Sequence, residues 1–349
     1  MREHGGQFFA LAQQLGYSNE QALMKLIDLS ASINPIKPLV ERRLNPDLLR
    51  HYPPLDPADL RDALAKKFAL RGSQICITNG ISSAILNLFA HFRPAHTVLY
   101  TPIYSEYQRA ANIYSQQSSE ISRRDNSTWL HQPVPKNAWV VWVNPSTPDG
   151  HYYSPEQLAP LIAHWKEQDC WVLVDESFLP FIGFEATSSF RGLLKEWPRL
   201  FILQSLTKYY ACPGVRIGAV FAQSDTLNQW PQPSWPISTR DSDYLIQALQ
   251  DSDFDRRSQA WLSDAKVDLV NQLSSHPLIE QVCPTNANFV LVKTRQPARL
   301  LSLGLQQQGI LVRACDSFGL GDCYLRIAVQ TPAIHQRLIA GLNKTDVAL

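Results

Sequence analysis

The sequence predicts an α/β protein, with a large domain of mostly parallel sheet flanked by helices and a smaller α+β domain. Two observations predict this class. Between residues 73 and 222, short apolar runs alternate with helical patterns and show little polar alternation, as expected of strands that are covered on both faces. After about residue 235 the pattern changes to a long amphipathic helix followed by shorter strands and helices.

The elements of the large domain are expected in alternating order. The apolar runs, rich in Val, Ile, Leu and Trp, predict strands at Gln74–Thr78, Thr97–Tyr100, Trp139–Val143, Trp171–Val174, Leu200–Leu203 and Val215–Phe221. The stretches between them predict helices at Ser82–Phe92, Glu106–Tyr114 and Pro155–Glu167. Ser154 is expected to cap the last of these helices, with Pro155 as its first residue.

The smaller domain is expected to follow a proline-rich hinge at residues 230–236. Its predicted elements are a helical region Ser242–Ser274, a strand Phe289–Val292, a helix near Ala298–Gln308, and strands Ile310–Arg313 and Tyr324–Val329. A second proline-containing segment, Asn34–Pro38, separates an N-terminal arm. We therefore expect an arm at residues 1–38 that packs with the small domain, a large ligand-binding domain at 39–236 and the small domain at 237–349.

Composition limits the partners that the protein can have. The net charge is +1, so no global field attracts nucleic acid or acidic membranes, and an anionic ligand must be bound by local groups. The N-terminal residues lack the apolar region of a secretory signal, and the longest apolar runs are too short to span a bilayer. The six cysteines are scattered without a Cys-x-x-Cys pair. We therefore expect no metal site, no nucleic-acid or membrane partner, and a reducing cytoplasm.

A lysine motif carries the chemistry. Ser205-Leu-Thr207-Lys208 follows the strand Leu200–Leu203, and Arg216 comes eight residues later in an Arg-x-Gly context. The carboxyl ends of such strands are where open α/β sheets bind ligands. A lysine there can form an imine with an aldehyde cofactor, while the hydroxyls and the guanidinium suit a phosphate. A lone lysine is usually a solvated surface residue, but the complete spacing favours the functional interpretation.

This spacing resembles the fold-type I pyridoxal-phosphate enzymes, the aminotransferase class I/II family, and the resemblance extends over nearly the whole chain. It implies the PLP-dependent transferase fold type I, with pyridoxal 5'-phosphate held by Lys208 as a Schiff base. Asp175, at the end of the strand Trp171–Val174, would pair with the pyridinium nitrogen of the cofactor. Lys208 and Asp175 are therefore the expected catalytic residues.

The resemblance also implies the remaining cofactor contacts. Backbone N–H groups at the helix start after Thr78 would hold the phosphate, Tyr104 would stack on the ring, and Tyr52 would reach the phosphate of a neighbouring subunit. A homodimer with shared active sites follows from the last contact. The expected cofactor-binding residues are Tyr52, Gly80, Ile81, Ser82, Tyr104, Thr147, Asp175, Ser205, Thr207, Lys208 and Arg216.

Two departures from the family pattern concern one cofactor atom. Thr147 replaces the asparagine that donates to the phenolic oxygen, and Phe178 stands where many aminotransferases have a tyrosine that contacts the same oxygen. We expect that oxygen to have fewer donors than usual, at about 1 kcal/mol for each missing hydrogen bond.

Further segments resemble one subfamily, the threonine-phosphate decarboxylases of cobalamin biosynthesis. They are His4-Gly-Gly, residues 28–35, residues 309–318 and residues 324–328. The resemblance implies that Arg326 binds an amino-acid carboxylate, while Arg313, His4 and Asn34 receive a side-chain phosphate. Arginine suits both anions because its planar donors bind them in a bidentate manner. The expected substrate is thus a small phosphorylated amino acid.

Two other interpretations stay open. Departures from the subfamily pattern at Ser32 and Ala314 leave the substrate unsettled, and a histidinol-phosphate aminotransferase needs the same amine and phosphate. Which substrate bond stands perpendicular to the cofactor ring decides between decarboxylation and transamination, and the sequence does not give that torsion. A non-catalytic cofactor-binding protein is the third interpretation, supported only by Thr147 and Phe178.

Overall fold

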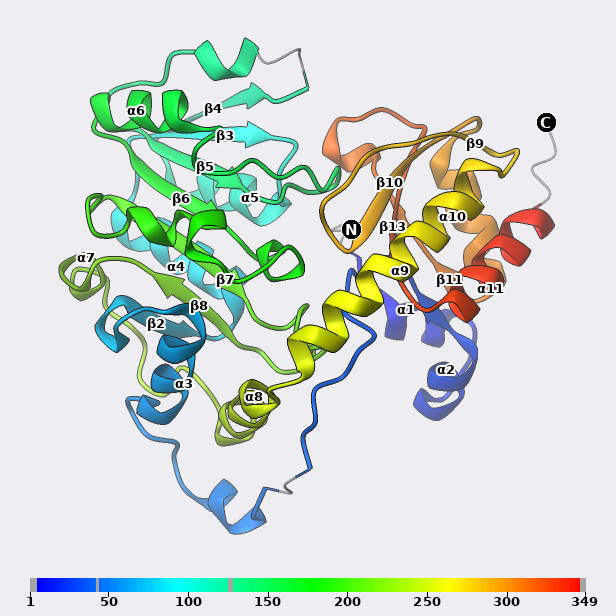
Figure 1. The fold of residues 1–349 in the computed structure, drawn as a ribbon, viewed down its shortest axis with the longest axis horizontal. Helices are drawn as coiled ribbons and strands as arrows, with labels where there is room; N and C mark the ends of the chain where they lie inside the picture. Colours follow the sequence, from blue (N-terminus) through cyan, green and yellow to red (C-terminus); the bar gives the residue numbers. More distant parts are fainter. Residues whose placement is uncertain (1–4, 42–43, 125–127, 346–349) are drawn as a thin grey trace. The chain divides into compact units, whose positions relative to one another are not determined.

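The computed structural model describes residues 5–41, 44–124 and 128–345, which fall into two compact units (Figure 1). Unit 1 comprises the residues up to Ile36, Pro148–His151 and the residues from Arg256 onward; unit 2 comprises Lys37–Thr147 and Tyr152–Asp255. The sequence predicts the second boundary at residue 236, whereas the structure keeps residues 237–255 in unit 2. Helix α8 (Thr239–Gln250) stays there because it packs on α3 (Ala58–Phe68).

Unit 2 is built on a seven-stranded sheet in the order β2-β8-β7-β6-β5-β3-β4. Strands β4, β3, β5, β6 and β7 are parallel to one another, and β8 is antiparallel to both β7 and β2. The predicted mostly parallel sheet is therefore confirmed. The strands are β2 Ile75–Thr78, β3 His96–Thr101, β4 Gln117–Ser122, β5 Trp139–Val143, β6 Trp171–Asp175, β7 Leu200–Ser205 and β8 Gly218–Phe221.

Helices cover both faces of this sheet. Val141 of β5 lies in a core cluster with Leu88 of α4 and Ala110 of α5. The next residue, Trp142, points to the opposite face because side chains alternate along a strand, and its ring lies 6.0 Å from that of Trp165 on α6. The other helices of unit 2 are α4 Gly80–Phe92, α5 Ser105–Tyr114, α6 Ala159–Glu167 and α7 Ser224–Asn228, with 3-10 turns η1 Pro46–Arg50, η2 Gly72–Gln74, η3 Thr128–His131, η4 Leu179–Phe181, η5 Ala186–Ser188 and η6 Phe190–Leu193.

Strand β8 and helix α6 begin at least three residues later than predicted. Strand β8 begins at Gly218 rather than Val215 because the preceding residues form turns. Helix α6 begins at Ala159 because residues 155–158 form a turn. In that turn the Ser154 hydroxyl accepts from the Gln157 N–H, so it does not cap a helix that starts at Pro155.

The predicted helical region over residues 242–274 is two helices, α8 and α9 (Phe254–Ser274). The break lies at Asp251, whose carboxylate accepts hydrogen bonds from the N–H groups of Leu39 and Asp253. The edge strand β4 has no counterpart among the predicted strands, because four of its six side chains are exposed and polar.

Unit 1 contains two small sheets and the helices around them. One sheet has the order β12-β13-β10-β9 and is antiparallel; the other pairs β1 with β11 in parallel, which joins the N-terminal arm to the C-terminal part of the chain. The elements are α1 Phe8–Gln14, α2 Asn19–Lys25, β1 Ile27–Asp28, α9, β9 Ile279–Val282, β10 Phe289–Thr294, α10 Ala298–Gln307, β11 Ile310–Leu311, β12 Arg313–Ala314, η7 Asp316–Phe318, β13 Tyr324–Ala328 and α11 Pro332–Lys344.

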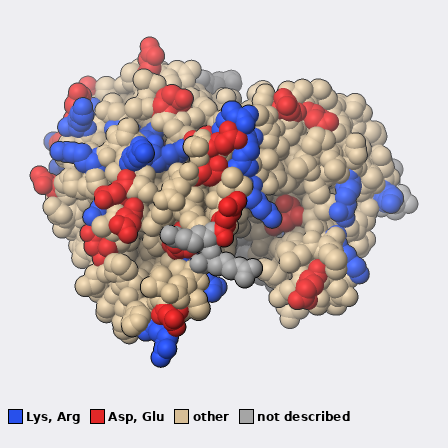
Figure 2. All heavy atoms as spheres, turned by 60° about the horizontal axis from the view of Figure 1, so that its bottom comes forward, with Lys and Arg blue, Asp and Glu red and all other residues tan. Residues whose placement is uncertain are grey.

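On the face drawn in Figure 2, acidic and basic side chains are interspersed, as the net charge of +1 suggests. All six cysteines are free. Within the described part of the chain, none of the helices has the length and apolar character needed to cross a membrane.

Candidate active site

Polar residues of the lysine motif lie at one edge of the unit 2 sheet. Asp175 is the last residue of β6 and Ser205 the last of β7, and these strands are parallel neighbours, with Asp175 opposite Leu203. Lys208 follows three residues after the end of β7. The carboxyl ends of parallel strands meet at one sheet edge, so the fold brings the two predicted catalytic residues to the same edge.

Asp175 is a buried carboxylate with two hydrogen-bond donors from the protein. Its Oδ2 atom accepts from the Tyr107 hydroxyl at 2.9 Å, and its Oδ1 atom accepts from the Ser177 N–H at 2.9 Å. The two bonds hold the carboxyl group in one orientation. The sequence does not predict the contact with Tyr107, although an aromatic residue one helical turn after Tyr104 was an available signal.

Lys208 lies among buried side chains of unit 2. Its Nζ atom is 4.9 Å from the centroid of the Phe178 ring, a cation–π distance. The Ser205 and Thr207 hydroxyl oxygens lie 3.2 Å apart, and the Ser205 N–H donates to the Ser177 hydroxyl at 3.1 Å. The aromatic residue that replaces the family tyrosine thus contacts the lysine itself.

The start of α4 forms a place for an anion. Gly80 has a φ of +69°, and a Cβ at that position would lie 3.0 Å from the Arg216 guanidinium. The N-cap residue Asn79 makes no side-chain capping bond, so its side chain does not occupy the first N–H groups of the helix. Gly218 approaches closely as well, because a Cβ there would lie 2.8 Å from the Ile81 nitrogen. Backbone N–H groups and a guanidinium therefore converge.

Two predicted tyrosines have different surroundings. Tyr104 precedes α5, and its hydroxyl lies 3.2 Å from that of Ser82; burial raises its pKa, so it remains a neutral phenol. Tyr52 is 80% exposed and stacks on Trp235 with ring centroids 4.5 Å apart. Thr147 is buried at the end of the first segment of unit 2.

Pyridoxal phosphate fits these residues in its charge pattern. The N-terminus of α4, Arg216 and the two hydroxyls suit a phosphate, and the Arg216 guanidinium lies close to Gly80. The buried carboxylate of Asp175 suits a protonated ring nitrogen. Lys208 supplies the amine that an aldehyde requires.

Unit 1 places the two predicted substrate arginines directly opposite each other. Arg313 of β12 and Arg326 of β13 are cross-strand partners. Like charges in that arrangement destabilise a sheet, which an anion between them would relieve. Burial lowers the pKa of Arg326 to about 10, and the charge of Arg313 acts in the same direction.

Ser30 connects Arg326 to the N-terminal arm within unit 1. Its carbonyl accepts from Arg326 Nη2 at 2.7 Å, its hydroxyl accepts from the Gly6 N–H at 2.9 Å and donates to Asp28 Oδ1 at 2.6 Å. A Cβ on Gly5 would lie 2.3 Å from the Ser30 carbonyl oxygen, so only glycine fits there. The sequence does not predict the role of Ser30.

The other two predicted substrate residues differ in what the structure says of them. His4 lies outside the described residues. Asn34 is 2% exposed; its amide nitrogen donates to the Ser258 hydroxyl at 2.9 Å, and its oxygen accepts from the Ile36 N–H at 3.0 Å. These contacts serve the fold, and the substrate role of Asn34 stays a prediction.

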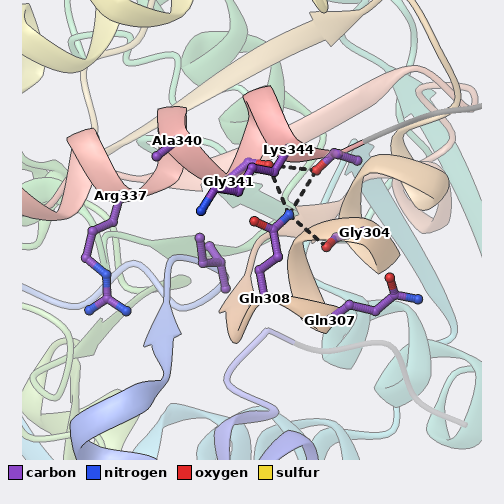
Figure 3. Close-up of a pocket in the computed structure, with 9 residues that line it drawn as sticks. Gly304, Gln307, Gln308, Arg337, Ala340, Gly341 and Lys344 are labelled. Carbon is purple, nitrogen blue, oxygen red and sulfur yellow. Dashed lines mark hydrogen bonds between the residues drawn. The ribbon is translucent and has the colours of Figure 1, made fainter.

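Arg313 lines a cavity of about 370 Å³ in unit 1, together with Gly5, Ser30 and residues of α1 and α10. A larger hollow of about 590 Å³ lies between α10 and α11 and contains none of the predicted site residues (Figure 3). There the Gln308 amide nitrogen donates to the carbonyl oxygens of Gly304 and Gly341. Those bonds tie the two helices together, whereas the lining of the smaller cavity contains one of the predicted substrate residues, Arg313.

The fold and this donor set define a pyridoxal-phosphate-dependent enzyme of the class that contains aminotransferases and their decarboxylating relatives. The chain belongs to the aminotransferase class I and II family, whose sequence profile matches residues 26–342. Membership in this family implies pyridoxal phosphate as the cofactor.

Individual relatives have two kinds of activity. A threonine-phosphate decarboxylase from Salmonella typhimurium is 31% identical over 97% of this chain and 95% of its own length. A histidinol-phosphate aminotransferase from Buchnera aphidicola is 29% identical over 89% of this chain and 87% of its own. The solved histidinol-phosphate aminotransferase from Sinorhizobium meliloti, in complex with pyridoxal-5'-phosphate, superposes with a TM-score of 0.79 at 17% identity, covering 97% of this chain and 94% of that one. The last likeness concerns the fold alone.

Proposed function

We propose that this chain decarboxylates L-threonine O-3-phosphate, with uptake of one proton and release of carbon dioxide, to give (R)-1-amino-2-propanol O-phosphate for cobalamin biosynthesis. The observation that carries the proposal is the cross-strand pair Arg313–Arg326, which suits a substrate with two anionic groups. The similarity to the Salmonella threonine-phosphate decarboxylase over nearly the full length of both chains supports it.

The roles in unit 1 follow from the chemistry of the substrate. Arg326 would bind the carboxylate and Arg313 the phosphate, assisted by His4 and Asn34. The Ser30 carbonyl accepts from Arg326 Nη2. This bond sets the orientation of the planar guanidinium before the substrate binds. Binding both anionic groups of the substrate sets the orientation of its Cα. That orientation decides which bond at Cα is placed for cleavage.

The roles in unit 2 concern the cofactor and the proton. Bound pyridoxal phosphate would supply an electron sink for the pair left at Cα when carbon dioxide departs. Lys208 would hold the cofactor between turnovers and deliver the proton to Cα. Asp175 would keep the ring nitrogen protonated, and Tyr104 would cover one ring face. Gly80, Ile81, Ser82, Ser205, Thr207 and Arg216 would hold the phosphate, and Thr147 would lie near the phenolic oxygen.

A histidinol-phosphate aminotransferase is the second candidate, favoured by the relatives with that activity. Histidinol phosphate carries a phosphate but no carboxylate. The two arginines would then serve that substrate and an amino-acid partner in turn, whereas threonine phosphate engages both at once. The arginine pair therefore favours decarboxylation.

Product analysis tests the proposal. The purified holoenzyme is incubated with threonine phosphate labelled at the carboxyl carbon, and released carbon dioxide is counted beside the organic phosphate product. A parallel reaction contains histidinol phosphate and 2-oxoglutarate, and glutamate is measured. Labelled carbon dioxide in the first reaction supports the proposal, while glutamate in the second without carbon dioxide in the first overturns it.

A homodimer with shared sites is the second part of the proposal. Tyr52 is 80% exposed, and Leu39, Leu48 and Leu55 in the same segment are also largely exposed, so this part of unit 2 offers apolar surface to another molecule. We place a second copy of the chain there, with Tyr52 reaching the partner's cofactor phosphate. The free cysteines support a reducing cytoplasm as the location.

Mixing inactive protomers tests the sharing. Tyr52→Phe and Lys208→Ala protomers, unfolded and refolded together, should form heterodimers in which one site has both lesions and the other has neither. Random pairing then restores about a quarter of the wild-type sites. No recovery on mixing, or a fully active monomer in sedimentation, would contradict sharing.

A further inference from the structure

Tyr107 is a buried phenol for which the reaction described above gives no role. It lies on α5, is fully buried, and donates its hydroxyl hydrogen to Asp175 Oδ2 at 2.9 Å. We propose that Tyr107 is a positioning residue that holds the Asp175 carboxylate ionised and aimed, and thereby keeps the shared proton on the ring nitrogen of bound pyridoxal phosphate. The inference rests on the proposed cofactor site and adds a residue to it.

The direction of the hydrogen bond is settled by chemistry. Burial, and after it the negative charge of Asp175, raises the pKa of Tyr107 well above its usual range. The phenol therefore keeps its proton, and an ionised carboxylate can only accept. Tyr107 is thus a permanent donor to Asp175.

Two donors fix the carboxylate in its plane. Ser177 N–H binds Oδ1 and Tyr107 binds Oδ2, so rotation of the carboxyl group would break both bonds. Each carboxylate oxygen can accept a second hydrogen bond, so a cofactor N–H still finds an acceptor. The position of the Tyr107 ring is also restrained, because the ring lies in the buried core cluster of unit 2 together with Ala110, Ala111 and Val141.

One turn of α5 links this support to the stacking residue. Tyr104 is the N-cap residue of α5 and its carbonyl accepts from the Tyr107 N–H at 3.0 Å, and the two rings are edge to face with centroids 6.4 Å apart. The Tyr104 hydroxyl in turn contacts Ser82 at the start of α4. Tyr104, which is expected to cover the cofactor ring, and Tyr107, which supports Asp175, are therefore both positioned by the start of α5.

The consequence concerns the position of one proton. A hydrogen bond donated to a carboxylate stabilises its anionic form. Without Tyr107, that anion loses stabilisation in a buried site, and the proton between ring nitrogen and Asp175 shifts towards the carboxylate oxygen. A ring whose nitrogen is less protonated accepts electrons less well, so turnover falls as well.

The test reads the ring nitrogen itself. Holoenzyme is prepared with pyridoxal phosphate labelled with ¹⁵N in the ring, and the nitrogen chemical shift is measured by solid-state NMR at one pH in wild type, Tyr107→Phe and Tyr100→Phe. Tyr100 is the matched control, a buried tyrosine of β3 whose hydroxyl accepts from the Trp165 indole N–H at 3.2 Å. We expect Tyr107→Phe to move the signal towards that of unprotonated pyridine and to weaken cofactor binding roughly ten-fold. Tyr100→Phe should do neither.

A second variant keeps the test decisive if Tyr107→Phe does not fold. Replacing Tyr107 by 4-aminophenylalanine preserves shape and retains a weaker N–H donor, so its signal should fall between those of wild type and Tyr107→Phe. A nitrogen signal unchanged from wild type in this variant and in any folded Tyr107→Phe would overturn the inference. Wild-type protein that binds no pyridoxal phosphate would instead refute the proposed site, and the carbon dioxide assay judges the reaction separately.

Discussion

The two units prepare charged groups in opposite ways. In unit 2 the buried carboxylate of Asp175 receives two hydrogen bonds from the protein, so its orientation is set before any ligand arrives. In unit 1 the register of β12 and β13 sets Arg313 against Arg326, and like charge faces like charge. The first arrangement suits a resident cofactor. The second arrangement, the arginine pair, is stabilised when an anion binds, which suits a substrate that binds and leaves in each turnover.

The difference teaches where binding free energy is expected to appear. Changes in unit 2 should affect cofactor retention and its spectrum, while changes at the arginine pair should affect substrate affinity and leave the spectrum unchanged. The following predictions would sharpen or break that division.

The largest effect is expected for Lys208→Ala. The variant should lack the visible chromophore that borohydride reduces in the wild type, and activity should fall by about 10² to 10⁴-fold, the range for loss of a general acid–base group. Absorption before and after borohydride, with peptide mapping, checks this. Lys195→Ala, at an exposed lysine, is the control. A reducible adduct on another lysine would contradict the assignment.

Arg313→Ala should weaken threonine phosphate roughly ten- to a hundred-fold, because a charge-assisted partner is lost, and should change the binding of unphosphorylated threonine little. Titration calorimetry with both ligands measures the contrast. Arg299→Ala is the matched control, since Arg299 lines the same cavity but pairs with Asp316 at 3.1 Å. Equal losses for the two ligands would show that Arg313 does not receive the phosphate.

Gly218→Ala should weaken the cofactor about ten-fold while leaving the substrate preference unchanged. The added Cβ would lie 2.8 Å from the Ile81 nitrogen and displace the start of α4. Gly214→Ala is the control because nothing lies within 4 Å of a Cβ there. The dissociation constant of pyridoxal phosphate, from fluorescence quenching, is the measurement. If Gly218→Ala bound pyridoxal phosphate as tightly as the wild type, the start of α4 would not form the phosphate site.

The smallest effect is expected for Thr147→Asn. Fewer donors to the phenolic oxygen leave it a stronger partner for the imine proton, so restoring one donor should lower the pH of the spectral transition by about one unit. A spectral titration of both proteins measures it. A transition at the same or higher pH would mean that the oxygen already has a donor in the wild type.

The sequence predicts those features of the fold that are encoded locally. Strand β5 matches the predicted range Trp139–Val143 because five consecutive apolar residues are buried on both faces. Strand β4 escapes prediction because its exposed Gln, Ser and Glu side chains resemble a loop. The lysine motif places Lys208 beyond a strand end because strand, turn and hydroxyls are neighbours in sequence.

The residues missed at the candidate site are connected across the chain. Tyr107 contacts Asp175 from 68 positions away, and Ser30 contacts Arg326 from 296 positions away. No local pattern encodes such pairs, since they arise only when the sheet of each unit has set its register. The motif therefore identifies the residues that are expected to contact the ligands. The residues that position them, Tyr107 and Ser30, become apparent only in the folded structure.

The pairing of β1 with β11 bears on the order in which the protein is made. Ile27 pairs with Ile310, and the Ala328 N–H donates to the Leu29 carbonyl, so β1 and the residue after it are bound by backbone groups of β11 and β13. Unit 2 ends at Asp255, and its sheet is complete in the nascent chain before β11 leaves the ribosome. Strand β1 can therefore pair only after the sheet of unit 2 has been synthesised, so the β1–β11 sheet of unit 1 closes later.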